Sequence, residues 1–275
     1  SDNGRITAVI LNFTTNEIFR TGFPLYSVSK CKRKAVSIDF TRVSKYRPGY
    51  GYPGLAASEL LPVDKDFISV FDFESNQLTN LISLEWFVKE GFVSKTDQFW
   101  VDHFIFNPSG SKIGFNLRAL SGKAVKSSVF ILDIFSGSCI NILDTGMASH
   151  ADWYDDSTYA LWGRRGSVVK SIQHLNSNSL FGNLFNFIRR KGVPNFVRKN
   201  VYQDAFFKLD IETKRQTCFA ECVPPNEGSG HFSFSNNRRF MLNDGPLTAS
   251  GLRELMLIDL HSNAKFTVDE LYTPR

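Results

Sequence analysis

The chain has 275 residues, a formal net charge of +5 and a pI of about 9.0. Hydrophobic residues make up 42% of it and charged residues 21%, which indicates a globular chain and argues against disorder. No run of about 18 apolar residues occurs, so no membrane span is predicted. Phe is abundant, with 26 residues, and together with the β-branched residues it favours strands.

The positive charge suits an anionic partner. Nucleic acid is not predicted, because no zinc-finger, RNA-binding or helix-turn-helix signature is present. An acidic polysaccharide or oligosaccharide fits the same charge. The four cysteines lack zinc-site spacing, and the first residues lack the basic start and apolar stretch of a signal peptide. The compartment therefore stays open between cytoplasmic, periplasmic and secreted.

Two kinds of hairpin alternate along the chain. In the first kind, apolar residues with period two lead to an Asp or Asn, and a polar turn and a second strand follow. These hairpins lie at 9–19, 69–81, 130–143, 207–219 and 255–268, with the shared positions Asn12, Asp72, Asp133, Asp210 and Asp259. In the second kind, a polar four-residue turn joins two short apolar strands. These hairpins lie at 25–40, 103–118, 150–164 and 231–244.

Pairing each hairpin of the second kind with the next one of the first kind predicts four-stranded antiparallel units. They span residues 25–82, 103–143, 150–219 and 231–268. Such repeats are typical of β-propeller blades, and a two-sheet sandwich is the alternative. The extra hairpin at 6–20 predicts an outer half-blade. We therefore expect an all-β fold with one propeller domain over 1–275, four and a half blades of a seven-bladed ring, incomplete at the C-terminus.

Three segments depart from the strand pattern. Residues 42–66 predict a long loop rich in Gly, Pro and Tyr, and residues 82–92 predict one or two helical turns. Residues 171–203 form an insertion rich in Phe, Arg and Lys. Its basic cluster suits either an anion-facing flap or a solvated surface; it comprises Arg189, Arg190, Lys191, Arg198 and Lys199.

Three of the five histidines share one position in consecutive hairpins of the second kind. They are His103, His150 and His231, and each is followed three residues later by Phe or Trp. The first strand of a propeller blade lies next to the central channel, so the three histidines are expected at one mouth of it. The alternative is a structural role, in which each His ties down a turn of its blade.

Two arginines follow their histidines at nearly equal spacing. Arg118 closes the hairpin of His103, Arg164 closes that of His150, and Asp244 holds the comparable place after His231. Because the second strand of an antiparallel pair returns beside the start of the first, each group is expected near its His.

This residue set suits β-elimination at a uronic acid. Arg would neutralise the carboxylate, one His would act as base, and another His or a Tyr would protonate the leaving oxygen. Alternatively, the three histidines would bind a divalent metal such as Mn, Zn or Ca. In the loop 45–54, Arg47, Tyr50 and Tyr52 are candidates for a sugar-binding rim, or for tyrosines packed on the body.

The units "HFIFNPSGSKIGF" and "HFSFSNNRRFML" resemble the TolB-type, WD40-like propeller repeat. The His-led form, with "SHADW" and a following Arg, is similar to the propeller polysaccharide lyases, including oligogalacturonate and ulvan lyases. That resemblance implies an acidic polysaccharide cleaved at the propeller funnel. Oligogalacturonate lyases imply a metal held by several His, and ulvan lyases imply His, Tyr and Arg. TolB-type propellers equally imply a non-catalytic protein that binds a glycan or a protein partner.

Overall fold

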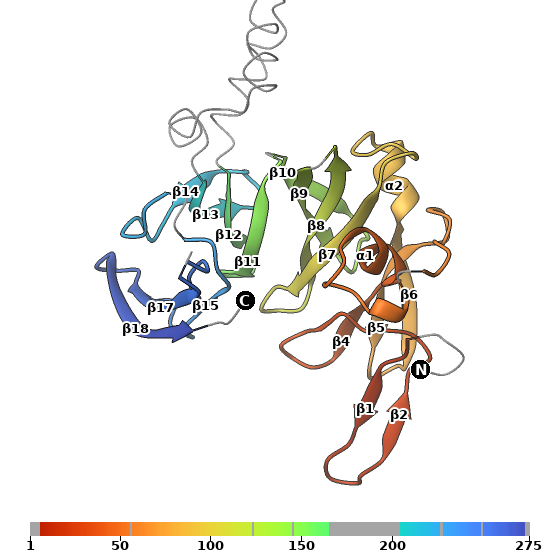
Figure 1. The fold of residues 1–275 in the computed structure, drawn as a ribbon. Helices are drawn as coiled ribbons and strands as arrows, with labels where there is room; N and C mark the ends of the chain where they lie inside the picture. Colours follow the sequence, from red (N-terminus) through yellow and green to blue (C-terminus); the bar gives the residue numbers. More distant parts are fainter. Residues whose placement is uncertain are drawn as a thin grey trace, which may run out of the picture. The chain divides into compact units, whose positions relative to one another are not determined.

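The computed structural model describes residues 6–55, 57–122, 124–144, 146–164, 204–225, 228–248 and 250–272 (Figure 1). The chain divides into two compact units. The first comprises residues 1–126 and 130–140, and the second comprises residues 127–129 and 141–275. The insertion at 171–203 and its basic cluster lie outside the described residues. The single domain over 1–275 stays a prediction.

The first unit begins with a two-stranded hairpin, β1 (Val9–Leu11) and β2 (Ile18–Arg20), which projects from the rest of that unit in Figure 1. A four-stranded antiparallel sheet follows. It consists of β3 (Ser27–Val28), β4 (Lys34–Ser37), β5 (Phe67–Asp72) and β6 (Gln77–Ser83) in chain order. The next sheet consists of β7 (Phe99–Phe106), β8 (Lys112–Ser121), β9 (Ala124–Asp133) and β10 (Cys139–Leu143). Parts of β9 and β10 belong to the second unit.

The second unit holds two more sheets of the same design. One consists of β11 (Ala148–Trp153), β12 (Thr158–Arg164), β13 (Asp204–Asp210) and β14 (Gln216–Cys218). The other consists of β15 (Phe232–Phe234), β16 (Phe240–Asp244), β17 (Leu252–Asp259) and β18 (Ala264–Tyr272). Every neighbouring pair in these sheets is antiparallel. The four predicted four-stranded units are therefore confirmed.

The segments between strands contain short helices. Helix α2 (Leu84–Lys89) confirms the helical turns predicted at 82–92. The loop prediction at 42–66 was wrong at its start, where helix α1 (Thr41–Tyr46) forms, and a 3-10 turn η1 follows at Pro53–Leu55. A tertiary contact holds α1 in place. Arg42 is buried, and its guanidinium donates to Asp66 at 2.6 Å and to the Leu61 carbonyl at 2.7 Å. No helix in the described ranges is long and apolar enough to span a membrane.

Aromatic side chains dominate the core of each unit. In the first unit, Phe87, Phe115 and Phe130 are fully buried and their rings contact one another. In the second unit, Trp162 and Phe206 pack edge to face at 4.8 Å between ring centroids. Such pairs contribute beyond the area that they bury, which explains the many Phe residues in short strands.

The shared Asp or Asn of the first hairpin kind forms the turn that joins the two strands of that hairpin. Asp210 Oδ1 accepts hydrogen bonds from the backbone N–H of Glu212 at 3.1 Å and of Thr213 at 2.7 Å. The same side-chain-to-backbone pattern recurs at Asn12, Asp72, Asp133 and Asp259. The repeat that marked the blades is therefore a turn-forming device, because Asp and Asn mimic a backbone turn in this way.

Four residues after each of these side chains the backbone is left-handed. Its φ is 58° at Asn16, 56° at Asn76, 71° at Gly137, 56° at Lys214 and 54° at Asn263. Gly and Asn adopt this conformation at the lowest cost, and they occupy four of the five positions.

The left-handed turn gives a direct test of this device at Gly137. A Cβ added there would meet no atom within 4 Å, so only the backbone conformation opposes it. We expect Gly137→Ala to lower the free energy of unfolding by about 1–2 kcal/mol. Gly137→Asn should cost less, because three equivalent turns use Asn. Urea unfolding measures both variants, and equal losses for Ala and Asn would contradict this account.

Candidate active site around Asp102 and His103

A buried carboxylate organises the polar residues of the first unit. Asp102 on β7 is 1% exposed. Its Oδ1 accepts from His103 Nδ1 at 2.7 Å and from Arg118 Nε at 2.8 Å. Its Oδ2 accepts from Arg47 Nη1 at 2.7 Å and from Trp100 Nε1 at 2.9 Å. One carboxylate thus brings together the predicted site residues His103, Arg118 and Arg47.

His103 and Arg118 keep Asp102 ionised. Burial alone would raise the pKa of Asp102, but the hydrogen bond from His103 and the charge of Arg118 outweigh it and hold that pKa well below its usual range. An ionised carboxylate only accepts hydrogen bonds, so His103 Nδ1 carries the proton that it donates. In the neutral ring, Nε2 is then the basic nitrogen, which is the tautomer that a general base requires.

The backbone at His103 is strained and held in place. The pairing of β7 with β8 shifts between Asp102 and Ile105, which marks a bulge, and His103 has φ 59°. Its N–H donates to the hydroxyl of Tyr26 at 2.9 Å. The Tyr26 ring is itself stacked on Phe40 at 5.5 Å. Left-handed backbone at a non-glycine residue costs energy and recurs at functional sites, where the surroundings enforce it.

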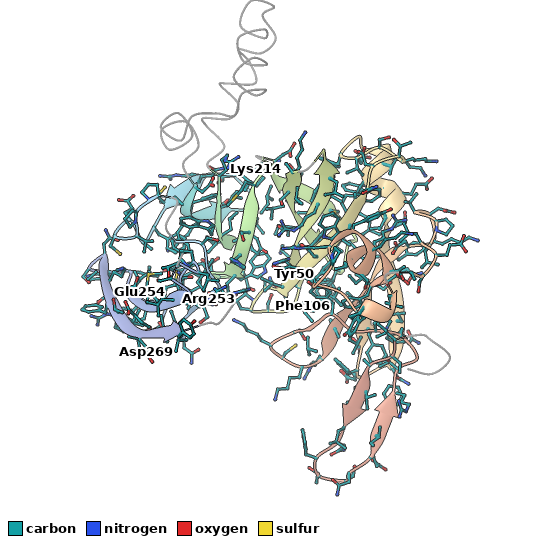
Figure 2. All side chains as sticks on the ribbon, viewed as in Figure 1. Tyr50, Phe106, Lys214, Arg253, Glu254 and Asp269 are labelled. Carbon is teal, nitrogen blue, oxygen red and sulfur yellow. The ribbon has the colours of Figure 1, made fainter. Side chains whose placement is uncertain are left out.

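The loop after helix α1 covers this site. The guanidinium of Arg47 lies 3.5 Å from the centre of the Tyr50 ring, and that ring lies 6.4 Å from the imidazole of His103. Tyr50, labelled in Figure 2, is 59% exposed. The Tyr52 N–H donates to Ser44 Oγ at 3.0 Å, which closes the loop. The structure therefore places Arg47 and Tyr50 beside His103, while their role in binding substrate stays a prediction.

Gly51 is what allows this loop to close. A Cβ at position 51 would lie 2.2 Å from Ser44 Oγ and 2.5 Å from Ser44 Cα. The neighbouring Tyr52 ring packs edge to face on Phe40, with 5.2 Å between ring centroids. Tyr52 thus anchors the loop on the body of the unit, although it remains 47% exposed.

Two other predicted histidines meet in the second unit. The rings of His150 and His231 lie 3.9 Å apart between centroids. His231 donates its backbone N–H to Asp244 Oδ1, and its Nδ1 lies 3.4 Å from Asp244 Oδ2. Arg253, labelled in Figure 2, lies 3.7 Å from the same carboxylate. The side chain of His231 is 73% exposed and therefore far more open to water than that of His103, which is 18% exposed, whereas His150 is half-buried.

Arg164 closes β12 and belongs to an ion pair. Its Nε donates to Asp204 Oδ1 at 2.9 Å across the β12–β13 pairing. The backbone N–H of Arg164 donates to the Met147 carbonyl at 3.1 Å. The guanidinium therefore stabilises the strand pair, and its predicted catalytic role stays a prediction.

The expected position of the histidines at the start of each inner strand was wrong for His103. It is the fifth residue of β7, because the strand begins at Phe99. His150 is the third residue of β11, where the pairing also shifts, and His231 directly precedes β15. What the three share is the distance to the end of the strand, at Phe106, Trp153 and Phe234.

The predicted metal set draws on both units, since His103 belongs to the first and the other two histidines to the second. Within each unit, the described residues include no group of three or more His, Cys, Asp or Glu side chains that could hold a metal ion. A site formed by all three histidines stays a prediction.

Sequence reasoning missed Asp102 and Tyr26. The available signal for Asp102 was the dipeptide Asp-His, since only His103 among the three histidines follows an acidic residue. Tyr26 lies 77 positions before its partner, and no local pattern connects the two.

Comparison with known proteins shows the fold. No protein-family model and no curated protein matches the chain. An oligogalacturonate lyase in complex with manganese is similar in structure, with a TM-score of 0.55, 12% identity, and coverage of 98% of this chain and 60% of that one. For the oligogalacturonate lyase of Vibrio parahaemolyticus these values are 0.56, 13%, 98% and 61%. A prolyl endopeptidase gives 0.52, 9%, 90% and 30%.

The four four-stranded antiparallel sheets and these likenesses define an all-β protein of the β-propeller fold. The chain spans about 60% of the length of the two lyases that it matches. At such low identity the likeness establishes the fold alone. The number of blades in a complete ring stays a prediction.

The depressed pKa of Asp102 predicts a specific acid sensitivity. A carboxylate with a folded pKa below its unfolded value of about 3.9 contributes stability above that pH and loses it as the pH falls through the folded pKa. We expect the free energy of unfolding to fall more steeply between about pH 5 and 2 in the wild type than in Asp102→Asn. Urea unfolding followed by Trp fluorescence measures this slope.

The matched control is Asp64→Asn, which removes an exposed carboxylate that makes no ion pair with any described residue. It should keep the wild-type slope. Parallel pH curves for the wild type and Asp102→Asn would show that the Asp102 network does not stabilise the fold.

Proposed function

We propose that the chain cleaves a uronate-containing acidic polysaccharide by β-elimination, with His103 as the base. The observation that carries this proposal is the Asp102–His103 pair at a strained bulge, beside an arginine stacked on an exposed tyrosine. The names of the two similar lyases support an acidic saccharide as the substrate class. The net charge of +5 supports an anionic substrate as well.

The proposed reaction assigns one task to each group. Arg47 binds the uronate carboxylate with guanidinium N–H groups that Asp102 does not use, since a guanidinium has five donors. Pairing of the carboxylate lowers the cost of charge that develops when the proton at the adjacent carbon leaves. His103 Nε2 takes that proton, and the electron pair forms the carbon–carbon double bond. The glycosidic carbon–oxygen bond breaks, and Tyr50 protonates the leaving oxygen.

Arg118 is a positioning residue in this scheme. It is 6% exposed and donates to both carboxylate oxygens of Asp102, at 2.8 and 3.0 Å. Its charge keeps Asp102 ionised, and Asp102 in turn fixes the tautomer of His103. The predicted catalytic role of Arg118 is thus proposed to be indirect.

A metal-dependent version draws on His150 and His231, whose rings are adjacent, together with His103. Imidazole suits Zn better than Mn or Ca, which prefer oxygen ligands. A bound divalent metal would supply the charge neutralisation that the present scheme assigns to Arg47. No step above depends on it.

A second candidate function is a non-catalytic propeller that binds a glycan or a protein partner. The observation that favours it is that two predicted catalytic arginines form ion pairs within the protein. Arg118 pairs with Asp102, and Arg164 pairs with Asp204. Arginines that stabilise strands serve a binding scaffold as well as they serve an enzyme.

The sharpest test of catalysis is His103→Asn. Asn tolerates the left-handed backbone at this position and its amide can still donate to Asp102, but it cannot take a proton. We expect the rate of β-elimination to fall by about 10²–10⁴-fold, with substrate affinity retained. The assay records absorbance at about 235 nm, where an unsaturated uronate absorbs, on a panel of polymers that includes polygalacturonate.

The matched control is Lys32→Asn, which makes the same kind of change at an exposed turn with φ 59°. It should leave the rate unchanged. Saccharide binding without any absorbance change across the panel would favour the non-catalytic function. An active His103→Asn variant would remove His103 from the mechanism.

A further inference from the structure

A polar cavity lies in the second unit, at the turn ends of its blades. It has a volume of about 490 Å³ and is lined by Tyr154, Lys208, Asn237, Arg238, Arg239, Leu260 and His261. His231 and Asp244 lie at one end of the β15–β16 pair, and Arg238 and Arg239 lie in the turn at the other end. The cavity is therefore distinct from the His150–His231 pair.

The cavity is strongly basic. None of its lining residues is acidic, and three are cationic. Arg239 is neutralised by Asp259 at 3.0 Å. Lys208 and Arg238 form no ion pair with any carboxylate of the described residues, although both side chains are only partly exposed. Two positive charges thus share one cavity without a counter-charge, which favours occupation by an anion.

Aromatic rings hold these two cations in position. Lys208 Nζ lies 3.3 Å from the centre of the Tyr154 ring. The Arg238 guanidinium lies 5.9 Å from the same ring and 5.7 Å from that of Phe234. Ring faces attract cations but do not neutralise them. The cations are therefore preorganised and keep N–H donors for a ligand.

The turn that carries Arg238 adds a second observation. Arg238 has φ 58°, and its N–H donates to the Ser235 carbonyl at 2.9 Å. The equivalent turn of the β7–β8 hairpin has Gly110, with φ 73°, whose N–H donates to the Asn107 carbonyl. Arginine in this conformation costs more than glycine, yet it extends a guanidinium into the cavity.

We propose that this cavity is a second binding site for an acidic saccharide, in which Lys208 and Arg238 hold a uronate carboxylate. The volume suits a small ligand, since such sites span about 300–1,000 Å³. Asn237 and His261 supply neutral hydrogen-bonding groups for hydroxyls. The identity of the ligand rests on the proposed function, whereas the anion affinity follows from the cavity itself. The site would hold a polymer chain away from the reacting bond.

Arg238→Gly is the decisive variant, because it removes the guanidinium and relieves the left-handed backbone, so the fold is retained. Lys208→Met removes the second charge and keeps an apolar stem. The matched control is Lys214→Gly, which removes one charge in the same unit. Lys214, labelled in Figure 2, lies at an exposed turn and has φ 56°. All variants carry His103→Asn, so that the substrate remains intact.

Calorimetric titration of the full chain with trigalacturonate measures affinity and the number of sites. We expect two sites, one of which weakens about tenfold or more in Arg238→Gly and in Lys208→Met and not in Lys214→Gly. Unchanged binding in both cavity variants would overturn the proposal, as would equal affinity for a neutral trisaccharide. If inorganic sulfate binds the cavity as tightly as trigalacturonate, the cavity is a simple anion site and the proposed saccharide site is refuted.

The lyase assay keeps the two proposals separable. Absence of β-elimination together with loss of one saccharide site in Arg238→Gly would refute the proposed reaction alone. Activity on polygalacturonate together with identical titrations of all cavity variants would refute the second site alone.

Discussion

The polar organisation of the first unit depends on the neutralisation of one buried carboxylate. Asp102 is nearly inaccessible to water, and an isolated charge there would cost several kcal/mol. Arg118 and Arg47 approach it from different elements, strand β8 and the loop after α1, and make its burial possible. The same contacts fix the ring of His103 and draw the loop with Tyr50 over it. Stability and site geometry therefore rest on one electrostatic network.

Much of the fold could be predicted because its signals are local. The Asp or Asn at each outer turn bonds to the backbone N–H groups two and three residues later, and the period-two strands flank it, so both are visible in a short window. Helix α1 escaped prediction because its stability is tertiary. Arg42 is buried only because Asp66, 24 residues away, accepts from it. Six residues give too short a pattern to reveal that partner.

The candidate site was predictable in part. His103 and Arg118 were identified from the hairpin register, and Arg47 and Tyr50 from the composition of their loop. The group that joins them, Asp102, was not predicted. In the sequence it is an ordinary polar residue of a strand, and only the folded structure buries it among four hydrogen-bond donors. The hairpin register also predicted where each arginine lies in its blade, but not which carboxylate it bonds to. Arg164 occupies a place comparable to that of Arg118, yet its guanidinium bonds to Asp204, on a strand that follows 40 residues later.

The three histidines show why an equivalent position does not imply equivalent chemistry. Each lies three residues before the end of its inner strand, so the blade supplies the same backbone site to all of them. The preceding residue is Asp102, Ser149 or Gly230, and only the first carries a carboxylate to the imidazole Nδ1 at 2.7 Å. At Gly230 a Cβ would lie 2.6 Å from the Asp244 carbonyl oxygen, so no acidic residue fits there. The fold repeats the position, and the preceding side chain decides which imidazole bonds to a buried carboxylate at short distance.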